Sequence, residues 1–192
     1  MKRRFASRLA GAVVLGTALF TPTRAAHAQY YANLSSGTHT AILLGLGVSF
    51  PAGGIASRVD PTGNFMLGFQ ARQANAPVAF RMDLTFQEFS GPDGWASINA
   101  LTFNAVALPE HNGETQWHAI LGLGPYYTTG SAFTGVYSGF HNSADFGING
   151  GGGISHGKKV AVFADFRYHL IFEGGRVIQM IPLTFGIALR TS

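Results

Sequence analysis

The sequence predicts an all-β protein, an eight-stranded antiparallel up-and-down transmembrane β-barrel. Three observations lead to this fold class. The chain opens with an export-type segment, the rest alternates apolar and polar residues with a period of two, and only 11% of its 192 residues are charged. Soluble domains usually carry charge on about a quarter of their residues. So low a charge content indicates a surface that does not face water.

Residues 1–28 have the organisation of a cleaved secretory signal peptide. A basic start at Lys2–Arg4 precedes the apolar stretch Leu9–Phe20, and Ala26 and Ala28 occupy the small-residue positions of a cleavage site. This apolar stretch is too short to span about 30 Å of hydrocarbon as a helix. That length disfavours the alternative of an N-terminal membrane anchor.

The mature chain is predicted to comprise a short periplasmic N-terminal segment, residues 29–39, and a barrel domain, residues 40–192. The signal peptide carries five of the 13 Lys and Arg residues, so eight basic and nine acidic side chains remain. No basic stripe is left to follow a phosphate backbone, and we expect no nucleic-acid partner. The lack of cysteine excludes disulfides, thiolate metal sites, a cysteine nucleophile and a cysteine-linked lipid anchor.

Eight stretches of the barrel domain alternate with period two between clusters of Gly, Pro, Asn and Asp, as β-strands do. In chain order they are Thr40–Phe50, Asn64–Arg72, Val78–Phe89, Ala96–Leu108, Gln116–Thr129, Ala144–His156, Val160–Phe172 and Val177–Arg190. They make up about 60% of the mature chain, which is too much strand for an ordinary globular domain. A membrane barrel needs that much, because every spanning backbone group must pair within the protein.

The first and last strands each have one face without charge. In the first strand this face is Ile42, Leu44, Leu46, Val48 and Phe50, and the last strand has a similar face from Val177 to Leu189. The fourth strand, Ala96–Leu108, alternates poorly, and its faces cannot be assigned from the sequence. The two longest connections, Pro51–Gly63 and Gly130–Ser143, are both odd-numbered, as expected if long loops face outward and short turns face the periplasm.

The apolar strand faces are predicted to contact lipid, although a soluble barrel with its apolar face inward would also alternate. The polar faces are rich in small residues, including Gly45, Gly122 and Gly153, which suit the narrow lumen of an eight-stranded barrel. Trp117 and Tyr127 share one face near opposite ends of the fifth strand, roughly 25 Å apart along the membrane normal. We therefore expect Trp117 at the periplasmic interface and Tyr127 at the outer one.

Two pairs of opposite charges lie on predicted polar faces. Arg81 and Asp83 are two residues apart on the third strand, and Asp165 and Arg167 are two residues apart on the seventh. Strands three and seven oppose each other in a barrel of eight. Because buried charges need partners, we predict a charge network that crosses and plugs the lumen.

Other candidate motifs fail a specific test. Gly152–Lys159 imitates a phosphate-binding loop, but Lys159 stands where a hydroxyl is needed and a strand follows instead of a helix. His39, His118 and His169 could face the lumen, yet none of them has a second ligand at a recognised metal spacing. We predict neither a metal site nor a cofactor.

Three stretches of the mature chain stand out: FGINGGGGI at Phe146–Ile154, VFADFRYHLIF at Val162–Phe172 and IPLTFGIALR at Ile181–Arg190. With the signal peptide and the repeated strands, they make the chain resemble the small bacterial outer-membrane β-barrel family of the OmpA/OmpX type. The resemblance implies that the barrel-assembly machinery recognises the C-terminal strand. The family usually ends on an aromatic residue, whereas this chain ends Leu189–Ser192.

Some small outer-membrane barrels act on lipid A, which raises the possibility of an enzyme. The segment FRYHLIF around His169 is similar to the site strand of the lipid A deacylase barrels, in which a serine follows the histidine by two residues; here that residue is Ile171. The adjacent Ser155 and His156 point to opposite faces of a strand. We therefore predict no catalytic residues.

The sequence thus predicts a monomeric outer-membrane barrel with a plugged lumen and a structural or surface-interaction role, such as adhesion or envelope stability. Its expected partners are outer-membrane lipid and lipopolysaccharide. Two alternatives stay open: a narrow porin-like channel for small solutes, and a lipid A-modifying enzyme.

Overall fold

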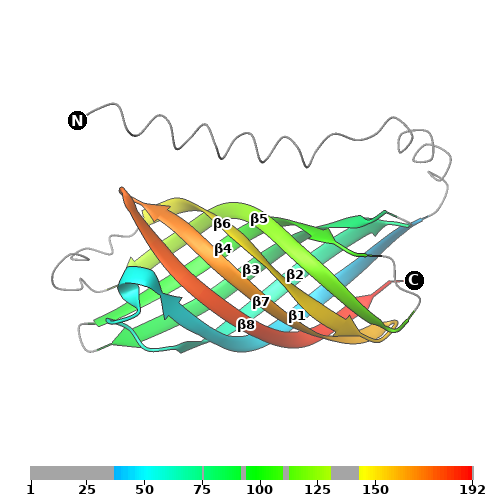
Figure 1. Ribbon diagram of the computed structural model, residues 1–192, viewed down its shortest axis with the longest axis horizontal. Helices are drawn as coiled ribbons and strands as arrows, with labels where there is room; N and C mark the ends of the chain where they lie inside the picture. Colours follow the sequence, from blue (N-terminus) through cyan, green and yellow to red (C-terminus); the bar gives the residue numbers. More distant parts are fainter. Residues whose placement is uncertain (1–36, 75, 92–93, 110–112, 131–142, 192) are drawn as a thin grey trace, which may run out of the picture. The chain divides into compact units, whose positions relative to one another are not determined.

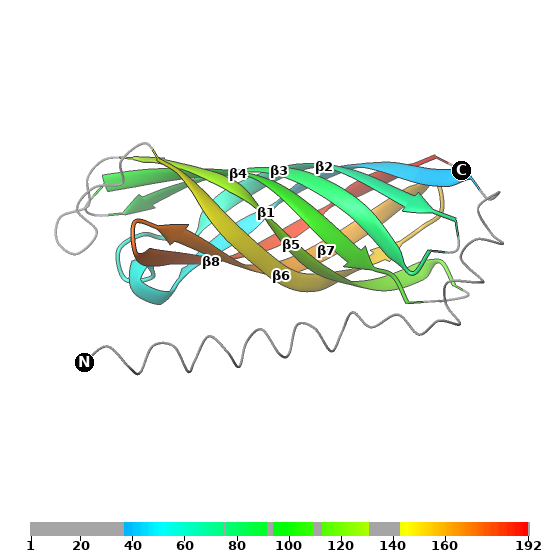
Figure 2. The ribbon, with the colours of Figure 1, turned by 90° about the horizontal axis from the view of Figure 1, so that it is seen from above.

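The computed structural model describes residues 37–74, 76–91, 94–109, 113–130 and 143–191. They form a closed barrel of eight antiparallel strands, each paired with its neighbours in the sequence, and β1 pairs with β8 to close it. The strands are β1 (Thr38–Ala52), β2 (Thr62–Gln73), β3 (Val78–Gly91), β4 (Gly94–Ala107), β5 (Thr115–Gly130), β6 (Ser143–His156), β7 (Val160–Glu173) and β8 (Arg176–Arg190). Figures 1 and 2 show that β1 begins and β8 ends at the same end of the barrel. We call it the terminal end and the opposite end the loop end.

The fold class predicted from the sequence is confirmed, and every strand end lies within two residues of its predicted position. Closure satisfies the backbone of all eight strands and leaves no free sheet edge. The tight turn between β7 and β8 shows how the chain reverses. Gly174 and Gly175 have φ of 49° and 86°, and Glu173 pairs with Arg176 across them. Two consecutive residues with positive φ form the hairpin turn that matches the twist of the strands.

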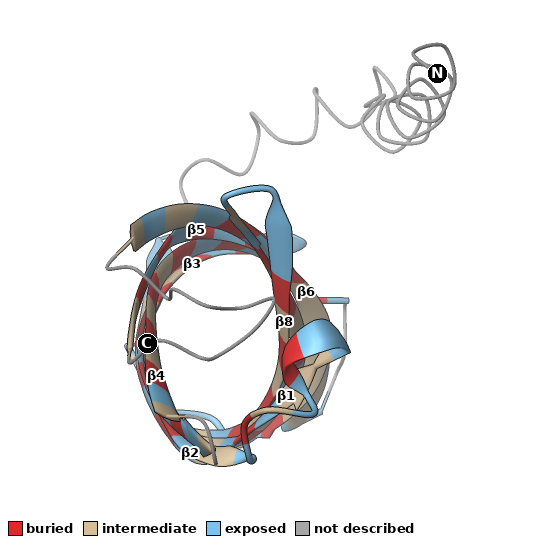
Figure 3. Cartoon of the chain, turned by 90° about the vertical axis from the view of Figure 1, so that its left-hand side faces the viewer, coloured by how far each residue is buried: buried red, intermediate tan, exposed pale blue. Residues whose placement is uncertain are grey.

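Side chains alternate between the lumen and the outer surface along each strand, and Figure 3 shows buried and exposed residues alternating along the strands. The outer surface is an apolar belt that includes Leu46, Leu121 and Phe185, which are each more than 60% exposed. Phe80 and Phe103 stack on this belt with their ring centroids 6.2 Å apart. An exposed apolar surface that encircles the barrel is what contact with lipid requires.

Within the described residues, no helix has the length and apolar character needed to cross a membrane.

The faces of β4, which the sequence left unassigned, are resolved by the structure. Ala96, Ile98, Thr102 and Asn104 point into the lumen, and Trp95 and Phe103 are exposed on the outside. Small residues occupy both faces of this strand, which is why its alternation was weak.

The connection between β1 and β2, residues 53–61, turns inward at the loop end. It begins with a short 3₁₀ helix, η1 (Gly53–Ile55), and its side chains Ile55 and Val59 are buried. The Asp60 amide donates a hydrogen bond of 2.8 Å to the Ser90 carbonyl. Gly91 lies so close to the Arg58 backbone that a Cβ there would collide with it. This connection, which the sequence predicts as one of the two long loops, therefore covers part of the mouth of the barrel.

The apolar belt predicts a depth-dependent cost of introducing charge. Leu123→Arg, at the middle of β5 on the exposed face, should lower the free energy of unfolding by about 2–4 kcal/mol in lipid vesicles. Ala144→Arg, exposed near the loop end of β6, should cost about 0–1 kcal/mol. Urea titrations followed by tryptophan fluorescence compare the two variants. Equal costs would contradict lipid contact at the middle of the belt.

Candidate functional site

Four buried charges meet in the middle of the lumen. Arg81 and Asp83 project from β3, and Asp165 and Arg167 project from β7 on the opposite wall. The Arg81 guanidinium lies 2.8 Å from Asp83 and 2.9 Å from Asp165, and the Arg167 guanidinium lies 2.8 Å from Asp83 and 3.2 Å from Asp165. Each arginine thus contacts both aspartates, and the four side chains close a ring that joins the two walls.

Side chains from the neighbouring strands β4 and β5 complete the hydrogen bonding of this ring. Asn104 on β4 donates to Asp83 Oδ2 at 3.0 Å, and a hydrogen bond of 2.8 Å joins His118 Nε2 on β5 to Asp165 Oδ1. Arg81 also donates to the Met66 sulfur at 3.2 Å and lies 5.7 Å from the centre of the Phe163 ring. Removing charges from water is costly, and attraction offsets that cost only when the remaining polar atoms are also paired.

Two glycines make room for the aspartates. A Cβ at Gly68 would lie 2.5 Å from Asp83 Oδ1, and a Cβ at Gly153 would lie 2.5 Å from Asp165 Oδ1 and 2.6 Å from His118 Nε2. The absence of a side chain at these two glycines is therefore required by the packing of the ring. The two glycines leave the volume that the charged side chains occupy.

Two further layers fill the lumen between this ring and the loop end. In the first, Thr184 donates to Asn64 at 3.2 Å, Asn64 donates to Ser49 at 3.2 Å, and Ser49 is hydrogen-bonded to Gln87. The second is a buried apolar cluster formed by Ile55, Val59, Phe89, Ala96, Ile98, Ala100, Tyr126, Ile171, Ile178 and Met180. The inturned loop supplies the first two of these residues, so the cluster closes the loop end of the lumen.

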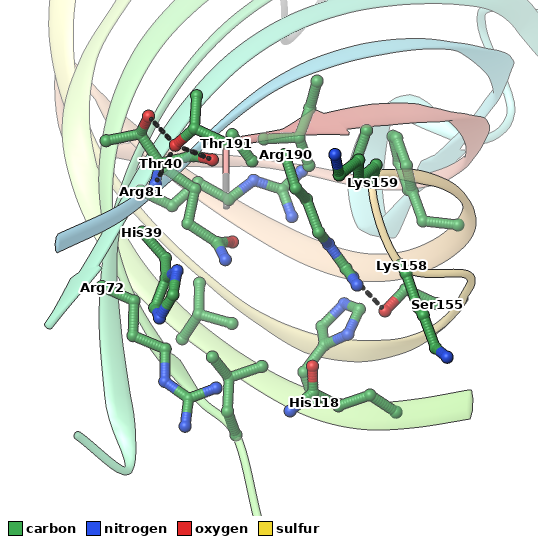
Figure 4. Close-up of a pocket in the computed structure, with 18 residues that line it drawn as sticks. His39, Thr40, Arg72, Arg81, His118, Ser155, Lys158, Lys159, Arg190 and Thr191 are labelled. Atoms are coloured by element: carbon green, nitrogen blue, oxygen red, sulfur yellow. Dashed lines mark hydrogen bonds between the residues drawn. The ribbon is translucent and has the colours of Figure 1, made fainter. Parts of the chain in front are cut away.

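The lumen is open on the other side of the ring. A cavity of about 640 Å³ extends from Arg81, His118 and Phe163 to the terminal end of the barrel (Figure 4). Its mouth carries Arg72, Lys158, Lys159 and Arg190. This cavity could not be predicted from the sequence, because its lining comes from all eight strands and from residues just beyond their ends. No local spacing links those residues.

The other predicted site residues are placed as follows. Trp117 and Tyr127 both point outward from β5, with exposed fractions of 65% and 48%. His118 and His169 face the lumen, and His39 lines the cavity at the terminal end. The signal peptide with Ala26 and Ala28, most of segment 29–39 and most of the connection 130–143 lie outside the described residues.

The described residues contain no group of three or more His, Cys, Asp or Glu residues that could hold a metal ion. Gly152–Lys159, which imitates a phosphate-binding loop, runs from β6 through a turn into β7. His169 is buried, and a hydrogen bond of 2.7 Å joins its Nδ1 to the Tyr126 hydroxyl. It does not reach the outer surface where it could meet lipid.

At the terminal end, a hydroxyl, an imidazole and a carboxylate lie next to one another. Thr115 Oγ1 lies 2.8 Å from His156 Nδ1, and His156 Nε2 lies 3.9 Å from Glu114. The second distance is too long for a hydrogen bond that would orient the imidazole. His156 and Glu114 are also both more than half exposed. The three groups lack the fixed geometry that nucleophilic catalysis requires.

Comparison with solved structures identifies the fold. The chain is similar to Neisserial surface protein A, with a TM-score of 0.57 and 13% identity over 80% of this chain and 99% of that one. A major outer membrane protein from Thermus thermophilus has a TM-score of 0.57 and 12% identity over 81% and 100% of the two chains. Ail, the attachment invasion locus protein of Yersinia pestis, has a TM-score of 0.50 and 12% identity over 81% and 99%.

The fold is that of the small outer-membrane barrels. This confirms the architecture that the resemblance implied. Neither a family model nor a curated protein sequence matches the chain. At such low sequence identity the likeness extends to the fold alone, and function must be argued from the lumen and the surface of this barrel.

The charge ring predicts that removing one of its side chains lowers the free energy of unfolding strongly, whereas replacing all four lowers it only slightly. Asp165→Ala leaves Asp83 as the single carboxylate for two buried arginines and removes the hydrogen-bond partner of His118, so it should lower the free energy of unfolding by about 3–5 kcal/mol. Replacing Arg81 and Arg167 with Met and both aspartates with Leu should cost less than the single change. Urea unfolding in vesicles measures both, and a quadruple variant less stable than Asp165→Ala would contradict this account.

The packing around the ring predicts that replacing two glycines of β6 with alanine has different effects on the free energy of unfolding. Gly153→Ala should lower the free energy of unfolding by about 1–3 kcal/mol, because its Cβ would collide with Asp165 and the Ala164 carbonyl. Gly150→Ala is the matched control. Its Cβ would have no neighbour closer than 3.7 Å, so it should be neutral or slightly stabilising. The same unfolding experiment ranks the two variants.

Proposed function

We propose that this protein is an integral outer-membrane barrel with a structural or surface-interaction role, and that its lumen does not conduct. The observation that carries the proposal is the closure of the lumen at successive levels. The charge ring crosses it between β3 and β7, and the apolar cluster fills it at the loop end. A barrel of eight strands has an interior that side chains can fill completely.

The loop end faces the cell exterior in this proposal, and the terminal end faces the periplasm. The strand ends that flank the two longer connections, residues 53–61 and 131–142, lie at the loop end, and longer connections are usual on the outer side of such barrels. The chain would be exported by the signal peptide 1–28 and would enter the membrane through assembly machinery that recognises β8. Lipid would cover the apolar belt, and lipopolysaccharide would surround the loop end.

The proposed role is not enzymatic. Among the described residues, the imidazoles near hydroxyl groups are those of His156, which is exposed and poorly oriented, and His169, which is buried against Tyr126. Neither places a nucleophile beside an oriented base at the surface where lipid A would bind. Binding through the loops requires no such arrangement.

The first test is electrical. The purified protein in planar bilayers should show no stable conductance steps, because buried side chains block the lumen at several levels. Arg81→Ala with Arg167→Ala should not conduct either, because the polar layer and the apolar cluster still fill the lumen, provided that heat-dependent gel mobility shows a folded barrel. Large, stable steps from the unmodified protein would favour the narrow channel instead.

The second test is orientation in intact cells. The chain has no cysteine, so a single introduced thiol reports its own location. A membrane-impermeant maleimide should label Ser57→Cys, on the exposed part of the inturned loop, without permeabilisation. Lys158→Cys, whose native side chain is 80% exposed at the terminal end, should be labelled only after the outer membrane is permeabilised. The reverse pattern would contradict the proposed orientation.

A further inference from the structure

The cavity at the terminal end is large enough for a small organic molecule. Its volume of about 640 Å³ falls within the range of ordinary ligand pockets, about 300–1,000 Å³. It is a dead end, because the charge ring forms its floor. A molecule entering from the terminal end would therefore stay in the lumen rather than pass through.

The mouth of the cavity is positively charged. Arg72 pairs with His39 across β1 and β2, Arg190 ends β8, and Lys158 and Lys159 lie in the turn between β6 and β7. Figure 4 shows Arg72 and His39 on one side and the two lysines on the other. None of the described residues that line the cavity is Asp or Glu. Lys158 is paired with Glu114 outside it, at 3.4 Å.

Some donor groups at this mouth are used within the protein, and others are left for a ligand. Arg190 donates from Nη1 to the Gly157 carbonyl at 2.8 Å and from Nη2 to the Ser155 hydroxyl at 2.9 Å, and each of these nitrogens carries a second N–H. Arg72 uses its Nε to donate to the Ala76 carbonyl at 2.8 Å. Within the described part of the chain, neither Arg72, Lys159 nor Arg190 forms an ion pair with a carboxylate. Like charges held together at one opening attract an anion, and an arginine fork suits the oxygens of a carboxylate or phosphate.

The walls of the cavity are apolar on opposite sides. Leu43 and Phe163 belong to a cluster on β1, β2, β7 and β8, and Val106 and Leu108 belong to a second cluster beside β4. The polar groups at the floor already have partners: Arg81 contacts both aspartates, and His118 is hydrogen-bonded to Asp165. The floor therefore offers little to an anion, whereas the mouth offers much. This difference sets the orientation of a bound ligand, with its charged group at the mouth and its apolar part toward the floor.

We infer that the terminal end of the barrel binds a small amphiphilic organic anion. Its oxyanion head group, a carboxylate or a phosphate, lies among Arg72, Lys159 and Arg190. Its apolar body lies between the walls formed by Leu43 and Phe163 on one side and Val106 and Leu108 on the other. The site is independent of the proposed role of the loops, because it uses the opposite end of the molecule.

The test uses octyl phosphate and octanoate as probes, with the full barrel in phosphatidylcholine nanodiscs and its leucine methyl groups labelled for NMR. Either probe should shift the Leu43 and Leu108 signals saturably. The outward-facing Leu44 and Leu121 report partition of the probe into lipid and serve as internal controls. The probe with the lower Kd identifies the preferred head group. Uncharged 1-octanol and inorganic phosphate should each bind at least ten-fold more weakly.

Charge variants test the mouth separately from the walls. Arg72→Gln with Lys159→Gln should raise the Kd of the better probe at least ten-fold. Arg58→Gln with Arg176→Gln removes the same charge at the loop end and should leave the Kd unchanged. Ala188→Leu adds volume between Leu43 and Ala161, beside the pocket, and should reduce binding of both probes. Heat-dependent gel mobility confirms that each variant is folded.

Three results would overturn the inference. The first is equal affinity for 1-octanol and the two charged probes, which would mean that the mouth does not recognise an anion. The second is a shift of Leu44 and Leu121 without saturable shifts of Leu43 and Leu108, because the probes would then be dissolved only in lipid. The third is an unchanged Kd in the folded Arg72→Gln, Lys159→Gln variant.

Discussion

The ring of Arg81, Asp83, Asp165 and Arg167 is the interaction on which the interior of this barrel depends. Each arginine contacts both aspartates, so the ring ties β3 to β7 and alternates in charge around its circumference. Burial makes any incomplete version costly, because one missing partner leaves an uncompensated charge away from water. The need for completeness accounts for Asn104 and His118, which pair with the carboxylate oxygens, and for Gly68 and Gly153, which leave space for them.

The ring also divides the lumen into two unlike halves. Toward the loop end, a polar layer and an apolar cluster fill the space, and the inturned loop adds Ile55 and Val59 to the cluster. Toward the terminal end, the lumen widens into a cavity with apolar walls and a cationic mouth. The lumen is therefore open at one end and does not run through the barrel. The two ends differ: the lumen is filled at the loop end and opens into a basic pocket at the terminal end.

The outer surface obeys a simpler constraint. Lipid contact demands apolar side chains at every outward position along the middle of each strand, and it places no demand on their identity. This permissiveness explains how barrels that share 12–13% of their residues with this chain have the same fold. Because lipid selects only apolar character, the surface carries little information about function, and the distinguishing features lie in the lumen and at the ends of the barrel.

The sequence alone determined the architecture, because period-two alternation is a local property and a lipid-facing strand cannot depart from it without cost. It also placed Arg81 with Asp83 and Asp165 with Arg167 on inward faces, since residues two apart share a face of a strand. Only the tertiary structure decided the orientation of β4, the inward turn of residues 53–61 and the cationic cavity. These features depend on contacts between residues far apart in the chain. His39 and Arg72 meet Lys159 and Arg190 only when β8 closes on β1, and no spacing along the sequence records that closure.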